Sequence, residues 1–423
     1  MRTVRHLDGQ SAIFLPSVAK KPLGWYYLYM EKNLENQIDE ILSRGVAEAI
    51  GKDSLRKKLL SGEKLRIKFG MDPTSPNIHI GRAVLLLKLK DLQELGHHII
   101  LLVGNATGVI GDTSDKDSER PMLVQEMVEK NMQAYAQQAG KLLDMSKVEV
   151  VYNADWLNKL GYREIGEHAD CFSLHEFISR DNIKKRLDAG KRVSLREVLY
   201  PLMQGYDSVE LRADVELGGQ DQRFNLLAGR VLQEKFGQKP QDILMTNIIS
   251  GTDGRKMSSS WGNTINLLDD SNSMFGKIMS IPDSLLQEYL IHCTRVSMDE
   301  IEKLLQMENP RNAKIVLAQE IVNIYHGEIE AEKAKEYFVK TISNKEIPDE
   351  VTEVKVEKDE IKLVEFLVLA DLAKSNGEAR RKIEQGGLEI NGTRESDWQK
   401  VLTKSDDGAV LKVGKFGFAK IVF

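Results

Sequence analysis

The most informative stretch of the chain reads Leu65-Arg66-Ile67-Lys68-Phe69-Gly70-Met71-Asp72-Pro73-Thr74-Ser75-Pro76-Asn77-Ile78-His79-Ile80-Gly81-Arg82. Apolar and charged residues alternate from Leu65 to Phe69, which is the period of a β-strand, and leucines recur at helical spacing from Leu85 to Leu92. The intervening Gly/Pro loop thus opens a helix, whose first N–H groups and positive dipole end suit an anion such as phosphate. We expect a strand–loop–helix unit in which His79 and Arg82 contact that anion.

A second loop combines two cations with glycines and serines. It runs Gly254-Arg255-Lys256-Met257-Ser258-Ser259-Ser260-Trp261-Gly262-Asn263. Either loop alone is compatible with an ordinary polar turn, because short motifs match by chance. Together, His79–Arg82 and Lys256–Ser260 resemble the HIGH and KMSKS signatures of class I aminoacyl-tRNA synthetases, and the pair is far more specific than either half.

The composition limits the class of protein. A chain of 423 residues with 41% hydrophobic and 29% charged residues has room for two or three globular domains. Its two cysteines, Cys171 and Cys293, argue against a disulfide framework and a zinc site and suit a reducing compartment, so we expect a cytoplasmic protein with no resident metal. The net charge of −5 gives no global attraction to RNA, and the absence of an 18-residue apolar run excludes a membrane-spanning helix.

Strand-like and helical segments alternate through the first 264 residues. Strands are expected at 99–103, 148–152, 214–217 and 243–249, with helices between them. Two of these strands lead into glycine-rich loops that carry a carboxylate, Asp112 in Gly104–Ser114 and Asp221 in Gly218–Gln222. This order predicts an α/β fold, a doubly wound parallel sheet of Rossmann-like type that binds its ligand at the carboxyl ends of the strands.

One helix carries a row of polar side chains. Tyr200, Gln204 and Asp207 fall at positions i, i+4 and i+7 of a helix within 195–208, so they share one face. Packing against a core would place apolar residues there. The row therefore predicts a polar pocket, although a solvent-exposed face is the alternative that the pattern leaves open.

The expected domains follow from composition along the chain. Residues 1–29 are expected to be a disordered extension, 30–264 the Rossmann-like catalytic domain that begins with a helix over 33–50, 265–343 a helical domain, and 344–359 a charged linker. Residues 360–423 are expected to form a small α+β domain. That domain groups four cations, and such a group is either an RNA-binding patch or a solvated helix face: Lys374, Arg380, Arg381 and Lys382.

Further motifs extend the resemblance to bacterial tyrosine–tRNA ligases. The tyrosine-pocket helix of that family is matched by Tyr200-x-x-x-Gln204-x-x-Asp207, its ribose-binding turn by Gly218–Gln222, and its ammonium-binding loop by Ala106–Asp112. The pattern from Ser375 to Gly392 resembles the small RNA-binding domain shared by a ribosomal protein and several RNA-modifying enzymes. The resemblance covers the chain from Met30 to Phe423.

The resemblance implies a role for each matching residue. Tyrosine would be bound by Lys68, Thr107, Asp112, Tyr200, Gln204 and Asp207, and ATP by Asp72, Thr74, Gly81, Gly219, Asp221, Gln222, Lys256 and Ser259. The catalytic set would be His79, Arg82, Lys256 and Ser259, and tRNA would contact Lys116 and Arg120 besides the cation group of the tail. Three positions depart from the family pattern: Arg82 replaces the second histidine of HIGH, Ser259 the second lysine of KMSKS, and Lys68 a phenol-binding tyrosine of some members.

The implied activity is the joining of L-tyrosine to tRNA. ATP would be a substrate that brings its own Mg²⁺, and the enzyme would be a homodimer without a membrane partner. Two alternatives stay open: a tryptophan-type ligase on the same scaffold, and a synthetase-derived RNA-binding protein that has lost activation. The intact set of pocket residues favours an active tyrosine enzyme over both.

Overall fold

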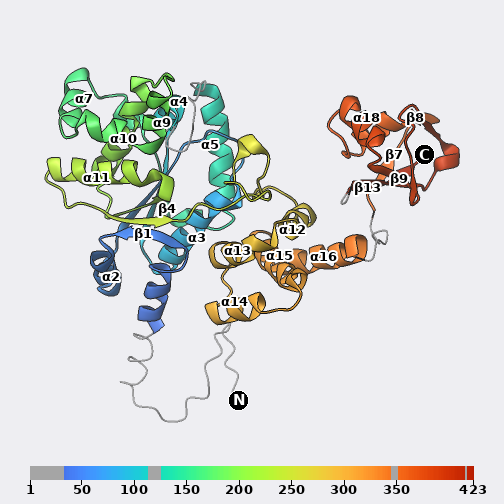
Figure 1. Cartoon of the computed structure of the whole chain (residues 1–423), viewed down its shortest axis with the longest axis horizontal. Coiled ribbons are helices and arrows are strands. Elements are labelled where there is room, and N and C mark those ends of the chain that lie inside the picture. Colours follow the sequence, from blue (N-terminus) through green and yellow to red (C-terminus); the bar gives the residue numbers. More distant parts are fainter. Residues whose placement is uncertain (1–32, 113–124, 344–350, 415–416) are drawn as a thin grey trace, which may run out of the picture. The chain divides into compact units, whose positions relative to one another are not determined.

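A computed structural model describes residues 33–112, 125–343, 351–414 and 417–423 (Figure 1). Two compact units make up the chain: the first comprises residues up to Asp72, Lys88–Gln125 and Ser146–Asn247, and the second Pro73–Leu87, Glu126–Met145 and Ile248–Phe423. No helix within the described ranges is both long and apolar enough to cross a lipid bilayer.

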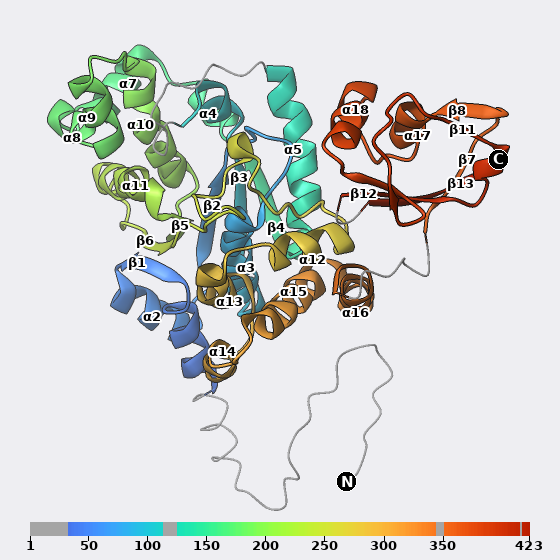
Figure 2. The ribbon, with the colours of Figure 1, turned by 45° about the vertical axis from the view of Figure 1, so that its right-hand side comes forward.

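The first unit is built on a six-stranded sheet, visible in Figure 2. Its strands follow the order β1-β6-β5-β2-β3-β4, and all neighbours are parallel except β1, which runs antiparallel to β6. Five of six residues of β3 are buried, as expected for a strand covered on both faces. The bounds are β1 Val46–Ile50, β2 Arg66–Met71, β3 His98–Val103, β4 Val148–Tyr152, β5 Val215–Gly219 and β6 Asp242–Thr246.

The strand order confirms the doubly wound prediction. From β2 the chain proceeds to β3 and β4 on one side, whereas β5 and β6 lie on the other side of β2. The order therefore reverses between β2 and β5. In an open α/β sheet, a ligand binds at such a switch point, beyond the carboxyl ends of the strands. Asp72 directly follows β2, and Gly219 ends β5, so both belong to this edge.

The expectation of one helix over 33–50 is wrong in its second half. The helix covers 33–41, and Gly45, with φ of 67°, turns the chain into strand β1. A left-handed φ is easy for glycine because it has no Cβ. Pairing of β1 with β6, about two hundred residues away, overrides the helical pattern of this short segment.

Helix α10, Leu195–Glu210, carries the expected polar row and packs on α11, Arg223–Lys235. The two helices approach closely at Gly205, where an added Cβ would lie 3.0 Å from the backbone of Ala228. Further helices of this unit are α2 Lys52–Leu60, α4 Asn105–Ile110, α6 Ala154–Leu157, α7 Tyr162–Ala169, α8 Leu174–Ile178 and α9 Asp181–Asp188. The glycine loop expected at Gly104–Ser114 thus begins with the short helix α4.

The second unit contains most of the remaining helices. Helix α3, Ile80–Glu94, starts in it, and residues 310–338 of the expected helical domain form two helices, α15 Pro310–His326 and α16 Glu328–Phe338. Gly327 divides them with φ of 86°. The other helices here are α5 Gln125–Ala139, α12 Ser271–Met279, α13 Leu286–Cys293 and α14 Met298–Leu305.

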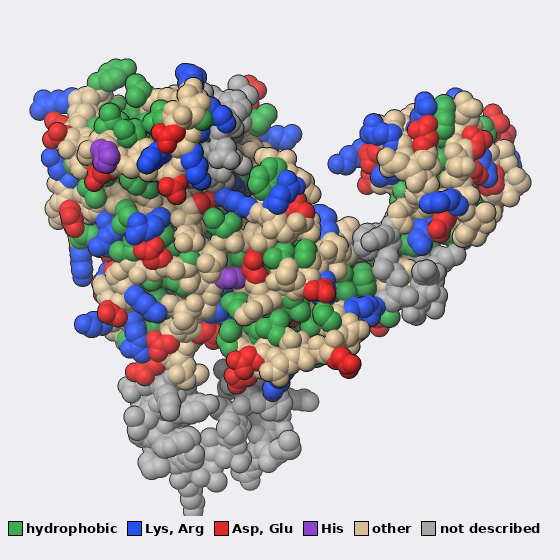
Figure 3. Space-filling model, viewed as in Figure 1, with side chains coloured by type: hydrophobic (Ala, Val, Ile, Leu, Met, Phe, Trp, Pro, Cys, Tyr) green, Lys and Arg blue, Asp and Glu red, His purple; other side chains and the backbone are tan. Residues whose placement is uncertain are grey.

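The C-terminal part of this unit has its own apolar core around Phe366, Ile383 and Leu411. It contains helices α17 Leu363–Leu369 and α18 Asn376–Glu384, a five-stranded sheet of order β10-β9-β12-β13-β7, and the pair β11-β8. The strands are β7 Glu353–Lys355, β8 Glu360–Lys362, β9 Leu388–Ile390, β10 Thr393–Arg394, β11 Val401–Thr403, β12 Val410–Val413 and β13 Gly417–Val422. Acidic and basic side chains are interspersed on the face of this part that Figure 3 shows.

Candidate active site

Tyr200 ties helix α10 to the end of strand β2. Its hydroxyl donates to Asp72 Oδ2 at 2.8 Å, while Thr107 Oγ1 donates to Asp72 Oδ1 at 2.8 Å. Burial and the nearby carboxylates of Asp72, Asp112 and Asp207 raise the pKa of Tyr200 well above its usual value, so it remains a neutral donor. Gly104 permits this arrangement, since a Cβ there would lie 2.0 Å from Asp72 Oδ1.

Asp207 lies one helical turn from Gln204 and is 1% exposed. Trp156 donates its indole N–H to Asp207 Oδ1 at 2.8 Å, and Asn153 donates to Oδ2 at 3.3 Å. Burial raises the pKa of Asp207 to about 7, against the lowering influence of the Lys68 cation and of these two hydrogen bonds. The polar row of α10 therefore faces the interior, and the solvent-exposed alternative is wrong.

Lys68 is fully buried, and its ammonium group is saturated by the protein. It donates to the Gln204 carbonyl at 3.0 Å and to Ser208 Oγ at 2.8 Å, and it pairs with Glu216 at 2.9 Å. An ammonium has three N–H groups, so none remains for a substrate phenol. A direct phenol contact, as expected for Lys68 from the family pattern, does not fit this geometry.

Asp112 and the turn after β5 are joined by a hydrogen bond. Gln222 Nε2 donates to Asp112 Oδ2 at 2.6 Å, and Asn225 donates to Gln222 Oε1 at 2.9 Å, which fixes the orientation of the Gln222 amide. Asp221 lies in the same 3-10 turn, Gln220–Gln222. A Cβ on Gly219 would lie 2.5 Å from Asp221 Oδ1, so a side chain at that position would displace the Asp221 carboxylate.

His79 belongs to the second unit and is held by strand-like pairing. Ile80 N donates to the Ile265 carbonyl, and Leu267 N to the Ile78 carbonyl, both at 2.9 Å. Burial, together with the positive charges of Arg82 and Lys256, lowers the pKa of His79 to about 3. The imidazole is consequently neutral at physiological pH, and its buried Nδ1 has no hydrogen-bond partner among the described residues.

Gly81 and Arg82 shape the surroundings of this histidine. A Cβ on Gly81 would lie 3.1 Å from His79 Nδ1 and 3.4 Å from Met257 Sδ, so a side chain there would crowd both. Arg82 Nη1 donates to the hydroxyl of Tyr135 at 3.0 Å, and Tyr135, on α5, is itself fully buried. The arginine at the position of the second HIGH histidine is thus anchored by a tyrosine. Thr74 is partly buried in the preceding loop.

The Lys256 loop is closed by Asn263, which is 3% exposed. Its Oδ1 accepts from Ser258 N at 2.8 Å, and its Nδ2 donates to Asp253 Oδ1 at 2.7 Å and to the Lys256 carbonyl at 3.1 Å. Hydrogen bonds from Asn263 and Arg255 lower the pKa of Asp253 to about 2. Ser259, where the second KMSKS lysine would stand, is exposed in a 3-10 turn.

Three of the four cations of the tail make local contacts. Arg380 pairs with Glu384 at 2.7 Å and lies 4.3 Å above the Trp398 ring, Lys382 pairs with Glu378 at 2.8 Å, and the backbone N–H of Lys374 donates to Glu378. Arg381 is exposed and forms no ion pair within the ranges that the structure covers. Lys116 and Arg120 lie outside the described residues.

Five residues that the sequence interpretation did not assign hold the predicted ones in place: Asn153, Trp156, Glu216, Tyr135 and Asn263. For Asn153 and Trp156 a signal existed, because they follow directly after strand β4, at the edge where ligands bind. Glu216 and Tyr135 gave no such signal, since a strand carboxylate and a helix tyrosine have no distinctive spacing.

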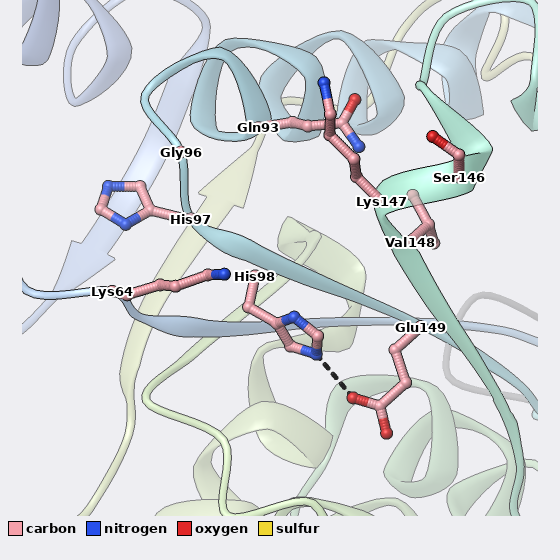
Figure 4. A pocket seen from close by; sticks show the side chains of 9 residues that line it. All are labelled: Lys64, Gln93, Gly96, His97, His98, Ser146, Lys147, Val148 and Glu149. Carbon is pink, nitrogen blue, oxygen red and sulfur yellow. Dashed lines mark hydrogen bonds and ion pairs between the residues drawn. The ribbon is translucent and has the colours of Figure 1, made fainter.

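A cavity of about 390 Å³ lies elsewhere in the first unit (Figure 4). It is lined by residues at the amino ends of β3 and β4, and His98 there meets Glu149 at 2.6 Å. None of the predicted site residues lines it. The lining residues are Lys64, Gln93, Gly96, His97, His98, Ser146, Lys147, Val148 and Glu149.

Comparison with known sequences gives two family matches. A family described as tRNA synthetases class I (W and Y) matches residues 60–343, and one described as the tyrosine–tRNA ligase SYY-like C-terminal domain matches 343–415. A tyrosine–tRNA ligase from Carboxydothermus hydrogenoformans is 44% identical over 399 residues, which span 91% of this chain and 97% of the relative. One from Thermotoga maritima is 42% identical over 393 residues, 92% and 97% of the two chains.

Solved structures share the fold. A C-terminally truncated mitochondrial tyrosyl-tRNA synthetase from Aspergillus nidulans has a TM-score of 0.59 at 22% identity, covering 73% of this chain and 98% of its own. Tyrosyl-tRNA synthetase from Archaeoglobus fulgidus, solved with L-tyrosine, has a TM-score of 0.57 at 24% identity, with coverage of 71% and 99%. Because these identities are low, the likeness concerns the fold.

Proposed function

The chain belongs to the tyrosine–tRNA ligase family of class I aminoacyl-tRNA synthetases, and we propose that it activates L-tyrosine with ATP and transfers it to the 3′ end of its tRNA. The observation that carries the proposal is the buried polar face of α10. Asp207 there is an acceptor that a phenol needs, and Gln204 and Tyr200 lie one and two turns before it.

The first step joins the tyrosine carboxylate to the α-phosphorus of ATP. A new O–P bond forms, the bond to the bridging oxygen breaks, and pyrophosphate leaves, so that tyrosyl-adenylate results. The nucleophile is already ionised and requires no general base. In the second step a hydroxyl of the terminal tRNA ribose attacks the acyl carbon, and AMP leaves. Mg²⁺ enters with ATP and neutralises phosphate charge when bound.

The phosphate side is assigned to His79, Arg82, Lys256 and Ser259. A neutral His79 donates one N–H to a phosphate oxygen, while Arg82 and Lys256 supply permanent positive charge. Catalysis in this step is positioning and stabilisation of the charge on the phosphoryl group. We assign the remaining ATP contacts to Asp72, Thr74, Gly81, Gly219, Asp221 and Gln222.

The tyrosine side is assigned to the first unit. Asp112, Tyr200 and Gln204 receive the ammonium group, Thr107 orients Asp72 beside them, and Asp207 accepts from the phenol. Lys68 contributes without touching the substrate, because its N–H groups are already used. This assignment explains why three carboxylates surround one neutral tyrosine hydroxyl.

The tail is assigned to tRNA, with Lys374, Arg380, Arg381 and Lys382 as phosphate contacts and Lys116 and Arg120 as further ones. Surface pairs such as Arg380–Glu384 are worth little in water, so they open readily when a phosphate approaches. We also assign a homodimer and a cytoplasmic location, which the family resemblance implies.

An aminoacylation assay tests the proposal, and two of its possible outcomes would contradict it. Purified protein is incubated with ATP, Mg²⁺, radiolabelled amino acid and bacterial tRNA, and the acid-precipitable label is counted. Tyrosine should be incorporated, whereas tryptophan should not. Incorporation of tryptophan instead would indicate a tryptophan-type ligase. Binding of tRNA without incorporation of either amino acid would indicate a synthetase-derived RNA-binding protein.

A further inference from the structure

A closed network of buried polar groups lies against helix α10. Lys68, on β2, and Glu216, on β5, are 0% and 1% exposed and form an ion pair of 2.9 Å. Glu216 also accepts from Ser208 at 3.0 Å, Gln241 at 2.5 Å and Gln204 at 3.2 Å. Lys68 uses its other N–H groups on Ser208 and the Gln204 carbonyl. The network thus joins the two strands at the switch point to helix α10.

Glu216 determines how the Gln204 side chain is turned. An ionised carboxylate only accepts hydrogen bonds, so Gln204 must present its amide N–H to Glu216 Oε1. The carbonyl oxygen of the same amide then faces elsewhere and remains available as an acceptor. An ammonium group has only donors and requires such an acceptor, whereas the opposite amide orientation would offer it N–H groups.

Lys68 also acts electrostatically on Asp207, the next polar residue of the row on helix α10. Asp207 is buried, and the neutral donors Trp156 and Asn153 are its hydrogen-bond partners. The charged groups that influence it are Lys68 from β2, which favours the ionised carboxylate, and Glu216 from β5, which opposes it. Around the same pocket, Asp72 and Asp112 act together with Asp207 on Tyr200.

We propose that the Lys68–Glu216 pair is a specificity-determining positioning device: Glu216 orients Gln204 to accept from the substrate ammonium, and Lys68, hydrogen-bonded to Gln204 and Ser208 on either side of Asp207, favours the Asp207 carboxylate as acceptor for the substrate phenol. The inference rests on the proposed tyrosine activation. In this inference Lys68 does not contact the substrate phenol directly, as the family pattern suggested for position 68, but acts on it indirectly through the electrostatics of Asp207.

The pair is poorly explained by stability alone. Removing two charges from water is costly, and a buried ion pair replaced by neutral groups of similar volume is often neutral or stabilising. Here all three N–H groups of Lys68 have acceptors and the Glu216 carboxylate has four partners, and the network fixes the side chain of Gln204, which we assign to the substrate ammonium. A device for orientation and charge accounts for that placement.

The test measures tyrosine-dependent pyrophosphate exchange in four forms of the full chain. Wild type, Lys68→Met, Glu216→Gln and the double variant are compared for KM, kcat, selectivity for tyrosine over phenylalanine, and the pH dependence of kcat/KM. The matched control is a second buried pair of the same unit, Lys58–Asp242 at 2.8 Å, changed to Lys58→Met and Asp242→Asn. Thermal unfolding of each variant is recorded alongside.

We expect Glu216→Gln to raise the KM for tyrosine about tenfold, the scale of one hydrogen bond to a charged group, with little change in kcat. Lys68→Met should lower the selectivity for tyrosine over phenylalanine about tenfold. The pH midpoint near neutrality should move up in Lys68→Met and down in Glu216→Gln, because the two charges act on Asp207 with opposite sign. The control variants should change thermal stability only.

The outcomes separate the inference from its premise. If wild type shows no exchange with tyrosine, the proposed function itself fails. If wild type is active and both network variants resemble the Lys58 and Asp242 controls, the inference is overturned. Should a single variant fail to fold, the double variant, which leaves no unpaired buried charge, must still raise the KM for tyrosine, because it lacks the carboxylate that orients Gln204. A double variant with the wild-type KM for tyrosine contradicts the inference.

Discussion

The indole N–H of Trp156 lies 2.8 Å from the carboxylate of Asp207, and this contact joins the segment after β4 to helix α10. It gives Asp207 a neutral donor that is not part of the Lys68–Glu216 network. Burial raises the pKa of Asp207 to about 7 even though this hydrogen bond lowers it. The proposed tyrosine site should therefore be sensitive to pH in the physiological range.

Selectivity for tyrosine over phenylalanine should rise as the pH increases from 6 to 8. The ionised Asp207 accepts more strongly from a phenol, and His79 cannot cause the transition because its pKa is about 3. This selectivity is the ratio of kcat/KM for tyrosine to kcat/KM for phenylalanine, measured by pyrophosphate exchange. In Asp207→Asn the ratio should be lower and flat over this range. A titration that persists in Asp207→Asn would assign it to another group.

Asp207 should also make the stability of the protein depend on pH. The folded pKa of Asp207 is raised above its ordinary 3.8, so its contribution to stability is present below pH 4 and is lost as the pH rises through 7. Asp207→Asn should thus gain in Tm relative to wild type between pH 5 and pH 8, measured by thermal unfolding. An equal Tm difference at both pH values would contradict the raised pKa.

Arg82→Ala should lower the rate of tyrosine activation by about 100- to 1,000-fold, the scale of one lost transition-state donor, and leave tyrosine binding nearly unchanged. Tyr135→Phe removes only the acceptor that holds the guanidinium at 3.0 Å and should have a smaller effect of the same kind. Single-turnover adenylate formation and equilibrium binding of tyrosine measure the two quantities. Arg56→Ala, which removes an exposed partner of Asp39, is the control. An unchanged activation rate in Arg82→Ala would remove Arg82 from the mechanism.

Asn263→Ala should impair the use of ATP rather than of tyrosine. Its amide closes the Lys256 loop through Ser258, Asp253 and the Lys256 carbonyl, so without it Lys256 is less well positioned. The KM for ATP in pyrophosphate exchange should rise about tenfold or more, consistent with the loss of several hydrogen bonds. Arg255→Ala, which removes only exposed contacts with Asp253 and Trp261, should change it little. Equal effects of both variants on the KM for ATP would contradict the role of Asn263 in positioning Lys256.

Truncation after residue 343 should separate the two steps. The truncated chain should keep pyrophosphate exchange and lose most transfer to tRNA. Within the tail, Arg380→Ala, Arg381→Ala and Lys382→Ala should each weaken tRNA binding, because the surface ion pairs of Arg380 and Lys382 are weak and open when a phosphate approaches. Binding isotherms at several salt concentrations measure this, and each lost phosphate contact should lower the log–log slope by about 0.7 to 0.9. Full aminoacylation by the truncated chain would contradict the assignment.

The strand–loop–helix unit around His79 was predictable because its signals are local. Alternation in Leu65–Phe69 and leucine spacing after Arg82 reflect only the periods of strand and helix. The polar row of α10 was predictable for the same reason, and its burial decided between the pocket and the exposed face.

The features that were missed depend on distant partners. Strand β1 forms because β6 lies beside it, although Val46–Ile50 has no strong strand pattern of its own. The acceptors of Lys68 come from residues 136 to 148 positions away in sequence, so no local pattern shows that its ammonium is saturated. Tyr135 likewise meets Arg82 across 53 residues. Such contacts are set by tertiary packing.

Tyrosine-dependent exchange of pyrophosphate into ATP by the purified full chain is the most direct measurement. The reverse of activation returns labelled pyrophosphate to ATP only when tyrosyl-adenylate forms at the site, and no tRNA is needed. Exchange should be rapid with tyrosine and far slower with phenylalanine or tryptophan, and Asp207→Asn should narrow that difference. Exchange at background with every amino acid, from protein that is folded and binds tRNA, would contradict the assignment of tyrosine activation to this chain.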